Sequence, residues 1–428
     1  MVRRRHIFYI EGYDPQGPKG YHSLFVYAAK RFQKLWPIKL EIGALELDTP
    51  HLAHWNVEAA TDDWQVSTRY DFLRLEAPIA KTLARPTWQL GLLSLKWALQ
   101  EWTSGRLIRI FRIGPRYALL LMILQTILTW WIGLSLTGGA LVGVLLAKII
   151  AAPLAASIAA ALVAAALLLF ALQPMVNILY GPRVMVAWLN IWKFAAGEPS
   201  GFDAPLEAYA RAIVAAARAN EADEIVVMGH CFGGMITPSV MARALELDPD
   251  LGRHGPKVTM MTLGAVTAAC ALHPRATRLR DDLKRIAIEP SIQWIDVQSR
   301  KDVMVFFDVD PVSAVGIDAG PQKCNPAIWK VRMRDLFAPG TYNKERWNFY
   351  RIHFQYVMGN DVRATYDYVM LCCSPLGAHE WMRDKSETVQ GFLRDLDRID
   401  PTRPQLVPLN ADKDAVIPWD NAVKAPLT

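Results

Sequence analysis

The feature that most constrains this chain is a stretch of 60 residues, 117–176, that carries a single formal charge. A transmembrane helix needs about 20 consecutive apolar residues. The stretch is therefore long enough for two spans, which we expect at 117–137 and 149–172, with a short turn between them. Gly138 and Gly139 lie where this turn would begin. The sequence predicts a two-helix transmembrane hairpin.

Basic residues lie on both outer sides of the apolar stretch. Arg183 follows the second predicted span, and no acidic residue interrupts the arginines before the first. These preceding arginines are Arg106, Arg109, Arg112 and Arg116. Because positive residues accumulate on the cytoplasmic side of membrane spans, we expect residues 106–182 to form a hairpin with both ends in the cytoplasm. The lipid bilayer is then the first predicted partner.

Composition excludes several other classes of protein. The chain is 52% hydrophobic and 21% charged, with 47 basic and 41 acidic residues, which is too apolar for a disordered chain. The basic residues concentrate beside the apolar stretch and do not interleave with aromatic residues, so anionic lipid is favoured over nucleic acid. The five cysteines show no paired spacing, so neither a zinc site nor a disulfide framework is predicted. No metal or cofactor is implied.

Short periodic segments before the apolar stretch predict the beginning of a soluble domain. Residues 6–10 are β-rich, residues 21–36 have apolar side chains at helical spacing, and residues 40–47 alternate as a strand does. We assign residues 1–105 to the first part of a soluble core.

A further helix is predicted over residues 86–102, and it has one apolar face. That face consists of Trp88, Leu92, Leu95, Leu99 and Trp102. One interpretation is a helix that lies in the membrane interface, and the other is a surface helix packed on the soluble core. The tryptophans and the nearby spans favour the interface.

Beyond residue 201 the chain alternates between helical and β-rich segments. The predicted helices cover 204–220, 235–247 and 276–286, and the predicted strands cover 224–228, 257–263 and 291–297. Such alternation is typical of an α/β fold with a mostly parallel sheet. We assign residues 183–428 to the second part of the core. If both parts form one sheet, the number of spans between them must be even, as in a hairpin.

The sharpest local motif is Gly229-His-Cys231-Phe-Gly233-Gly234, which joins a buried strand directly to a helix. This is the pattern of a nucleophile elbow, with cysteine at its centre. The residues two before and two after the nucleophile must be small, and Gly229 and Gly233 meet that need. The Cys231 thiol would then lie at a helix N-terminus, which favours both a thiolate and an oxyanion.

At this motif the sequence resembles the α/β-hydrolase superfamily. Dienelactone hydrolases and polyhydroxyalkanoate synthases are similar in having Gly-x-Cys-x-Gly-Gly, and class 3 lipases are similar in the spacing of the residues after the elbow. The resemblance implies an α/β-hydrolase-like sheet and a catalytic triad in the chain order nucleophile, acid, base. It also implies an oxyanion hole formed by two N–H groups, which we assign to Phe232 and, after the first strand, to Tyr13.

The acid of such a triad follows a late strand, and Asp302 occupies that position after the predicted strand 291–297. Asp296 lies within that strand, and Asp308 and Asp310 lie a few residues further on. Asp414 is the second candidate, because its Asp-x-x-x-Pro loop is similar to the acid loop of many hydrolases. No histidine follows Asp414, so that choice would require the order nucleophile, base, acid.

His353 is the leading candidate for the base, 51 residues after Asp302 and followed closely by a tyrosine, as in class 3 lipases. His379 is its main rival, and His273 precedes the candidate acid. His230, inside the elbow, is expected to have a role in packing and not to be the base.

Together these residues predict a membrane-anchored Cys-His-Asp hydrolase or acyltransferase that acts on an ester or thioester of a lipid-like acyl substrate. The lipid-like substrate is inferred from the membrane anchor and not from the site. The alternative is a catalytically inactive protein of the same fold that serves as a membrane scaffold or binding protein, since a cysteine in place of serine also fits an elbow that has lost its function.

Overall fold

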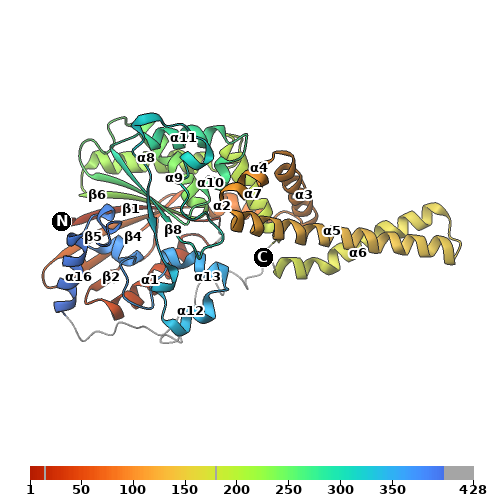
Figure 1. The fold of residues 1–428 in the computed structure, drawn as a ribbon, viewed down its shortest axis with the longest axis horizontal. Helices are drawn as coiled ribbons and strands as arrows, with labels where there is room; N and C mark the ends of the chain where they lie inside the picture. The colour runs from red at the N-terminus through yellow and green to blue at the C-terminus, as the bar shows by residue number, and fades with distance from the viewer. Residues whose placement is uncertain (14–15, 179–180, 400–428) are drawn as a thin grey trace. The chain divides into compact units, whose positions relative to one another are not determined.

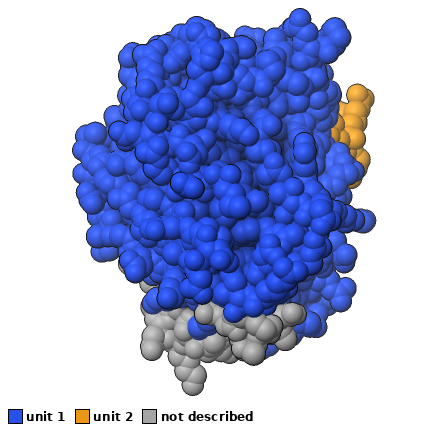
Figure 2. Space-filling view, turned by 90° about the vertical axis from the view of Figure 1, so that its left-hand side faces the viewer, with its two compact units in different colours: residues 1–81, 193–428 blue, residues 82–192 orange. Residues whose placement is uncertain are grey.

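The computed structural model describes residues 1–13, 16–178 and 181–399. The chain divides into two compact units, coloured separately in Figure 2. The first, which we call the core unit, combines Met1–Lys81 with Lys193–Thr428. The second, the hairpin unit, is Thr82–Trp192 and includes the helix expected at 86–102 as well as the apolar stretch.

The core unit has an α/β fold built on one sheet. Within the described residues the sheet has nine strands in the order β2-β4-β5-β1-β6-β7-β8-β9, and β3 pairs with β4. The strands are β1 Arg4–Ile10, β2 Lys39–Ile42, β3 Glu46–Leu47, β4 Leu52–Ala60, β5 Gln65–Leu73, β6 Glu224–His230, β7 Lys257–Leu263, β8 Ile292–Gln298 and β9 Ala327–Lys330. The neighbours β5-β1-β6-β7-β8-β9 pair in parallel. The pairs β2–β4, β3–β4 and β4–β5 are antiparallel. The sheet is therefore mixed: five of its eight strand pairings are parallel, as expected for a mostly parallel sheet, and the other three are antiparallel.

Helices cover both faces of this sheet (Figure 1). On one face lie α8 Asp203–Ala219, α9 Phe232–Leu247 and α11 Thr277–Ala287, and on the other lie α1 Gly17–Leu35 and α16 Glu387–Ile399. Every residue of β6 is buried, as are all but the first of β7. Strands buried on both faces have continuous apolar runs, and for this reason the sequence located these strands correctly.

The antiparallel part of the sheet was not predicted. Residues 40–47 form two short strands, β2 and β3, instead of one, and β4 and β5 form a hairpin around residues 61–64. Along β4 the side chains alternate, with Trp55 and Val57 buried and Asn56 exposed. One face of the β4–β5 hairpin thus packs in the apolar core, and the other face carries polar groups.

Shorter helices follow the main strands. They are α2 Glu76–Leu83, α10 Thr267–Ala271, α12 Pro339–Glu345, α13 Phe349–Phe354, α14 Tyr368–Cys373 and α15 Ala378–Trp381. Short 3₁₀ turns are η1 Ser313–Val315, η2 Gly320–Gln322, η3 Met333–Leu336 and η4 Gln355–Val357.

The hairpin unit is helical. Its helices are α3 Thr87–Thr103, α4 Arg106–Ile113, α5 Pro115–Ile149, α6 Leu154–Ile178 and α7 Gly181–Ala195, which ends in the core unit. Two of them, α5 and residues 154–172 of α6, are long and apolar enough to cross a membrane. At 1.5 Å per residue, α5 is about 50 Å long, well above the roughly 30 Å of a hydrocarbon core.

The turn between the two long helices lies at residues 150–153, not at Gly138 and Gly139. Those glycines lie inside α5. A Cβ atom at Gly139 would collide with the carbonyl oxygen of Ala161, and one at Gly143 would lie 2.8 Å from that of Ser157. Small residues one helical turn apart allow two apolar helices to approach closely. These glycines therefore mark the packing seam of the hairpin.

The two parts of the core unit share one sheet. Strand β1, from before the hairpin unit, pairs along its length with β6, from after it, so that Ile10 lies opposite Gly229. The segments before and after the hairpin unit are thus neighbours in a single fold.

Candidate active site

The candidate nucleophile lies at a sharp turn between β6 and α9. Cys231 has φ 55° and ψ −113°, a backbone conformation that residues other than glycine rarely adopt. Such strain persists only where the surroundings enforce it, and it concentrates at functional sites. His230, the last residue of β6, is buried, whereas Cys231 is partly exposed. This is the geometry of a nucleophile elbow.

Close packing at the elbow explains the glycines on either side. A Cβ atom at Gly229 would collide with the Thr237 hydroxyl, and one at Gly233 would collide with the carbonyl oxygens of Ile10 and Glu11. Substituting either glycine would push α9 away from β1 and β6. The spacing of the two glycines thus follows from the approach of the helix to the strands.

The groups predicted to hold an oxyanion lie beside Cys231. Phe232 is the first residue of α9, so its N–H has no acceptor within the helix. The loop after β1 passes next to the elbow, because a Cβ atom at Gly12 would lie 3.5 Å from that of Cys231. The next residue, Tyr13, packs its ring edge-on against the ring of Phe232, with centroids 5.6 Å apart. The direction of the Tyr13 N–H stays a prediction.

Asp302 and His353 meet in the interior of the core unit. The Nδ1 of His353 lies 2.7 Å from an Asp302 carboxylate oxygen, and both side chains are almost fully buried. The other oxygen of Asp302 accepts a hydrogen bond of 2.9 Å from the Met304 N–H. Because carboxylate oxygens only accept, Nδ1 carries the proton. Asp302 is therefore held in place and fixes the tautomer of the imidazole.

The second ring nitrogen of His353, Nε2, is the one available for proton transfer. It is buried and has no nitrogen or oxygen partner among the described residues. Burial alone lowers the pKa of His353, but the Asp302 carboxylate and the Cys231 sulfur outweigh burial and raise this pKa well above its usual value of 6.5. Cys231 is thus one of the groups that raise the pKa of His353, which indicates that the two side chains are neighbours.

His230 supports His353 in a way that the sequence did not predict. Its Nε2 donates a 3.0 Å hydrogen bond to the carbonyl oxygen of His353, and the two imidazole rings lie 4.7 Å apart. Burial and then the charge of His353 lower the pKa of His230 well below its usual value. The two neighbouring histidines therefore differ in protonation, since only His353 has a carboxylate partner.

The competing carboxylates have other partners. Asp296 accepts hydrogen bonds from the Thr262 hydroxyl and the Gln298 amide inside the sheet, and burial raises its pKa to about 6. Asp308 pairs with Lys330, and Asp310 with Lys323; these pairs are surface-accessible. Asp414 lies outside the described residues.

The competing histidines are also engaged elsewhere. His379 pairs with Glu380 at 2.9 Å and lies in the segment that contacts Glu224, the first residue of β6. Cys231 follows the opposite end of that seven-residue strand, roughly 20 Å away. His273 accepts a hydrogen bond from the backbone N–H of Arg275. Among the described candidates, only His353 is joined to the predicted acid.

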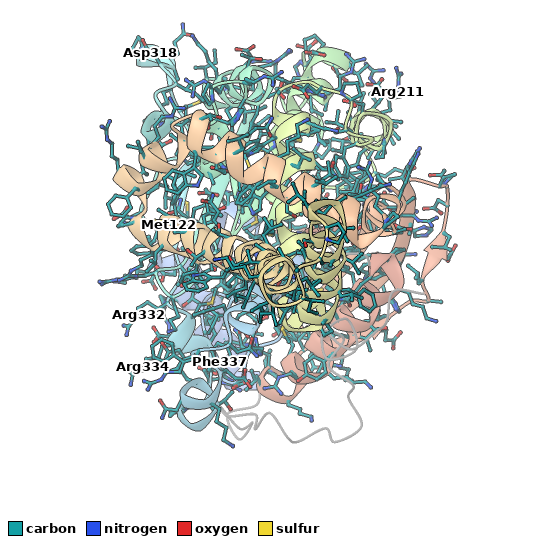
Figure 3. The ribbon with its side chains drawn as sticks, turned by 90° about the vertical axis from the view of Figure 1, so that its right-hand side faces the viewer. Met122, Arg211, Asp318, Arg332, Arg334 and Phe337 are labelled. Carbon is teal, nitrogen blue, oxygen red and sulfur yellow. The ribbon has the colours of Figure 1, made fainter. Side chains whose placement is uncertain are left out.

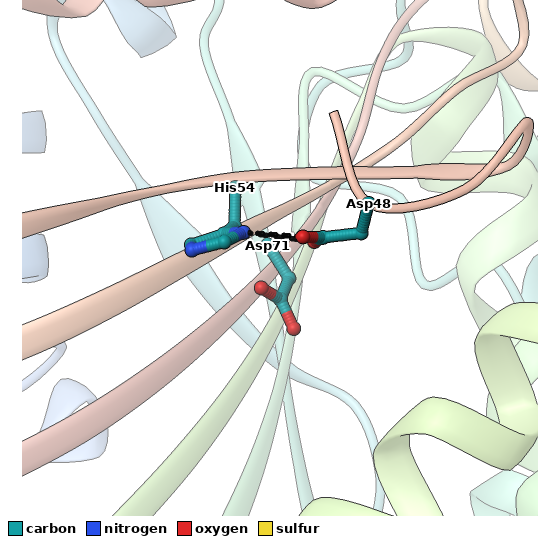
Figure 4. A group of neighbouring side chains, drawn as sticks. All are labelled: Asp48, His54 and Asp71. Carbon is teal, nitrogen blue, oxygen red and sulfur yellow. Dashed lines mark hydrogen bonds and ion pairs between the residues drawn. The ribbon is translucent and has the colours of Figure 1, made fainter. Parts of the chain in front are cut away.

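Three residues away from the elbow, Asp48, His54 and Asp71, have side-chain atoms close enough to share a metal ion, all within 4.8 Å of one another (Figure 4). His54 Nδ1 lies 2.8 and 2.9 Å from the two Asp48 oxygens. The Asp71 carboxylate is already held by His6 at 2.8 Å and by the Arg69 guanidinium at 2.9 Å. Because the guanidinium of Arg69 is always charged, the carboxylates of this group already have a cationic partner and form an ion-pair network.

No family model, no curated protein and no solved structure matches this chain. Its function must therefore be inferred from the geometry of the site.

Proposed function

We propose that this chain is a membrane-anchored Cys-His-Asp hydrolase or acyltransferase of the α/β-hydrolase fold, acting on an ester or thioester of a lipid-like acyl substrate. The observation that carries the proposal is the buried Asp302–His353 hydrogen bond next to a cysteine held at positive φ at the start of a helix. The chain order of Cys231, Asp302 and His353 supports the fold assignment. The two long apolar helices support a membrane-bound substrate.

In the first step of the proposed reaction, the Cys231 thiol gives its proton to His353 Nε2 and its sulfur attacks the carbonyl carbon of the substrate, so that the carbonyl electron pair moves onto oxygen. The N–H groups of Phe232 and Tyr13 stabilise that oxyanion. As the tetrahedral intermediate collapses, the imidazolium of His353 gives its Nε2 proton to the departing alcohol or thiol. The acyl group is then bound to Cys231 as a thioester.

In the second step a water molecule or an acceptor alcohol or thiol attacks the acyl-thioester. His353 Nε2 takes the proton of the attacking group, and Asp302 stabilises the imidazolium that forms. The Cys231 thiolate leaves and is restored beside the imidazolium. Attack by water gives hydrolysis, and attack by an acceptor gives acyl transfer.

A thiol-reactive acyl probe tests the proposal on the intact protein. We expect Cys231 to be labelled at least about tenfold faster than Cys324, the exposed thiol that serves as a matched control. Partial desolvation raises the pKa of Cys324, and full burial raises that of Cys373 to about 12, so neither is an activated thiol. Equal labelling of Cys231 and Cys324, site by site in mass spectra, would instead favour the inactive scaffold.

The proposal includes a topology in which α5 and α6 cross the bilayer and both parts of the core unit lie in the cytoplasm. The pairing of β1 with β6 requires these parts to be on one side of the membrane. The arginines before α5 support the cytoplasmic side.

We expect protease added outside intact cells to cleave neither part of the core unit, because both are enclosed by the membrane. The measurement is immunoblotting with tags at the two termini, and the control is permeabilised cells, in which both parts should be digested. Digestion of the N-terminal part alone in intact cells would contradict the topology and the shared sheet at once.

A further inference from the structure

Helix α3 exposes a stripe of apolar side chains, whereas its buried face combines Trp97 with polar side chains. Leu92, Leu95, Leu99 and Trp102 are 49–63% exposed. They recur every three or four residues, so they form one stripe along the helix. Ser94 and Glu101, which belong to the opposite face, are fully buried. A helix on the surface of a soluble domain has the reverse arrangement. The side chain of Trp88 lies outside the described residues.

Helix α4 continues this apolar surface. Gly105, at φ 65°, forms the turn after α3, and α4 then exposes Ile108 and Phe111 by 62% and 56%. Arg112, between the exposed apolar residues and the start of α5, is also exposed. We call the six exposed apolar side chains of α3 and α4 the apolar platform: Leu92, Leu95, Leu99, Trp102, Ile108 and Phe111.

A buried ion pair holds the platform in this orientation. Glu101 of α3 pairs with Arg106 at the start of α4, and both side chains are inaccessible to solvent. The rings of Trp188 and Trp192 in α7 each lie 5.1 Å from the Arg106 guanidinium. Because Glu101 and Trp97 on the buried face of α3 belong to this inner cluster, the leucines cannot turn inward without leaving two charges unpaired.

The excess of basic over acidic residues is concentrated in the hairpin unit. Of its 47 basic and 41 acidic residues, the hairpin unit holds eight basic residues and one acidic residue, Glu101, which leaves 39 basic and 40 acidic residues elsewhere. Glu101 is already paired. The hairpin unit therefore presents basic groups beside the platform, and the core unit is close to neutral.

We propose that the platform lies in the headgroup layer of an anionic leaflet, with α3 and α4 in the plane of the membrane and their leucines, tryptophan and phenylalanine below the headgroups. The platform is continuous in sequence with α5 through Gly114, which brings it to the membrane where α5 enters. Lys96, Arg112 and Arg116 reach the phosphate groups, as basic side chains do at an interface. The inference rests on the membrane-spanning hairpin proposed above and does not depend on catalysis.

Spin labels on the full-length protein test the proposal. Cys231 and Cys324 are replaced by alanine, and the other cysteines are buried. Single cysteines are then introduced as Leu99→Cys in the platform, Leu162→Cys in α6, and Asp318→Cys, an exposed position of the core unit labelled in Figure 3. Collisions with oxygen, which is soluble in lipid, are compared with collisions with a nickel chelate, which is soluble in water.

In vesicles of phosphatidylcholine and phosphatidylserine we expect the label at Leu99→Cys to collide mainly with oxygen, as at Leu162→Cys, and the label at Asp318→Cys mainly with nickel. In phosphatidylcholine alone the oxygen preference of Leu99→Cys should fall, while that of Leu162→Cys stays constant. A nickel preference at Leu99→Cys would overturn the proposal, and so would exclusion of both reagents, which indicates cover by protein. A nickel preference at Leu162→Cys would refute the hairpin itself.

Discussion

Replacing Cys231 with alanine is expected to abolish acyl-enzyme formation and to lower turnover of esters and thioesters by on the order of 10⁵-fold. The expected loss is large because no other group among the described residues combines an elbow conformation with the His353–Asp302 pair. The side chain is small and partly exposed, so its loss leaves little cavity. The measurement is intact-protein mass after incubation with an acyl substrate, together with steady-state turnover.

Two variants serve as controls for this experiment. Cys324→Ala removes an exposed thiol outside the site and should retain full activity. Cys231→Ser retains the elbow but replaces the nucleophile with a weaker one, and it should form an oxygen ester slowly. Unchanged thermal unfolding of Cys231→Ala would show that the fold is intact. Full turnover by Cys231→Ala would mean that the nucleophile is assigned incorrectly.

The parallel part of the sheet was predictable because its strands are buried on both faces. All of β6 is buried, as are all but the first residue of β7 and all but Gln293 of β8, and α11 buries Leu279, Leu283 and Ile286 at helical spacing. The predicted bounds of these strands agree with the structure within two residues at each end. For these strands, the apolar residues in the local sequence indicate the same positions that the fold buries.

The β4–β5 hairpin lies outside that pattern. Its alternation is present in the sequence, with Trp55, Val57 and Ala59 on one face and Tyr70 and Phe72 across from them. A period of two over nine residues predicts a half-buried strand. The sequence prediction relied on strands that alternate with helices along the chain, a pattern typical of strands buried on both faces. That pattern does not reveal antiparallel strands at the edge of a sheet, in which one face carries polar side chains.

The position of the turn between α5 and α6 could not be predicted from composition. Within a uniformly apolar stretch, Gly138 and Gly139 suggested a break in the helix, because glycine commonly ends helices. In the structure the glycines instead provide space for α6. Whether a glycine ends a helix or allows a second helix to pack closely depends on the neighbouring helix, which cannot be identified from the local sequence.

The candidate site was predictable from chain order but not in its supporting contacts. Asp302 and His353 were selected by their positions after a late strand and before the end of the core, and the structure brings them within 2.7 Å. The hydrogen bond from His230 to the backbone of His353 depends on the path of the chain 123 residues later. No local pattern near the elbow could reveal it.

In the proposed triad the base and the acid have unequal roles, so their removal is expected to have unequal effects. His353→Ala removes the imidazole that is proposed to exchange a proton with Cys231, and it should lower single-turnover acylation by about 10³- to 10⁵-fold. Asp302→Asn retains the shape but loses the charge, and it should cost about tenfold less, because a cysteine and histidine pair retains part of its activity.

The pH dependence of acylation gives a second measure of Asp302. His353 is protonated below its pKa, which the Asp302 carboxylate raises well above 6.5 against the effect of burial. The imidazolium donates the proton to the leaving group, so activity should fall as the pH rises through the pKa of His353. Loss of the carboxylate lowers that pKa, and the alkaline limb in Asp302→Asn should therefore move to lower pH.

Matched variants separate these roles from general damage to the fold. Asp308→Asn changes an exposed carboxylate in the same loop and His379→Ala changes a histidine near the far end of β6, and both should acylate normally. Collapse of acylation in Asp414→Asn with a normal rate in Asp302→Asn would transfer the role of acid to Asp414. Normal acylation in His353→Ala would remove the base from the proposal, and with it the reason to regard the buried Asp302–His353 pair as catalytic.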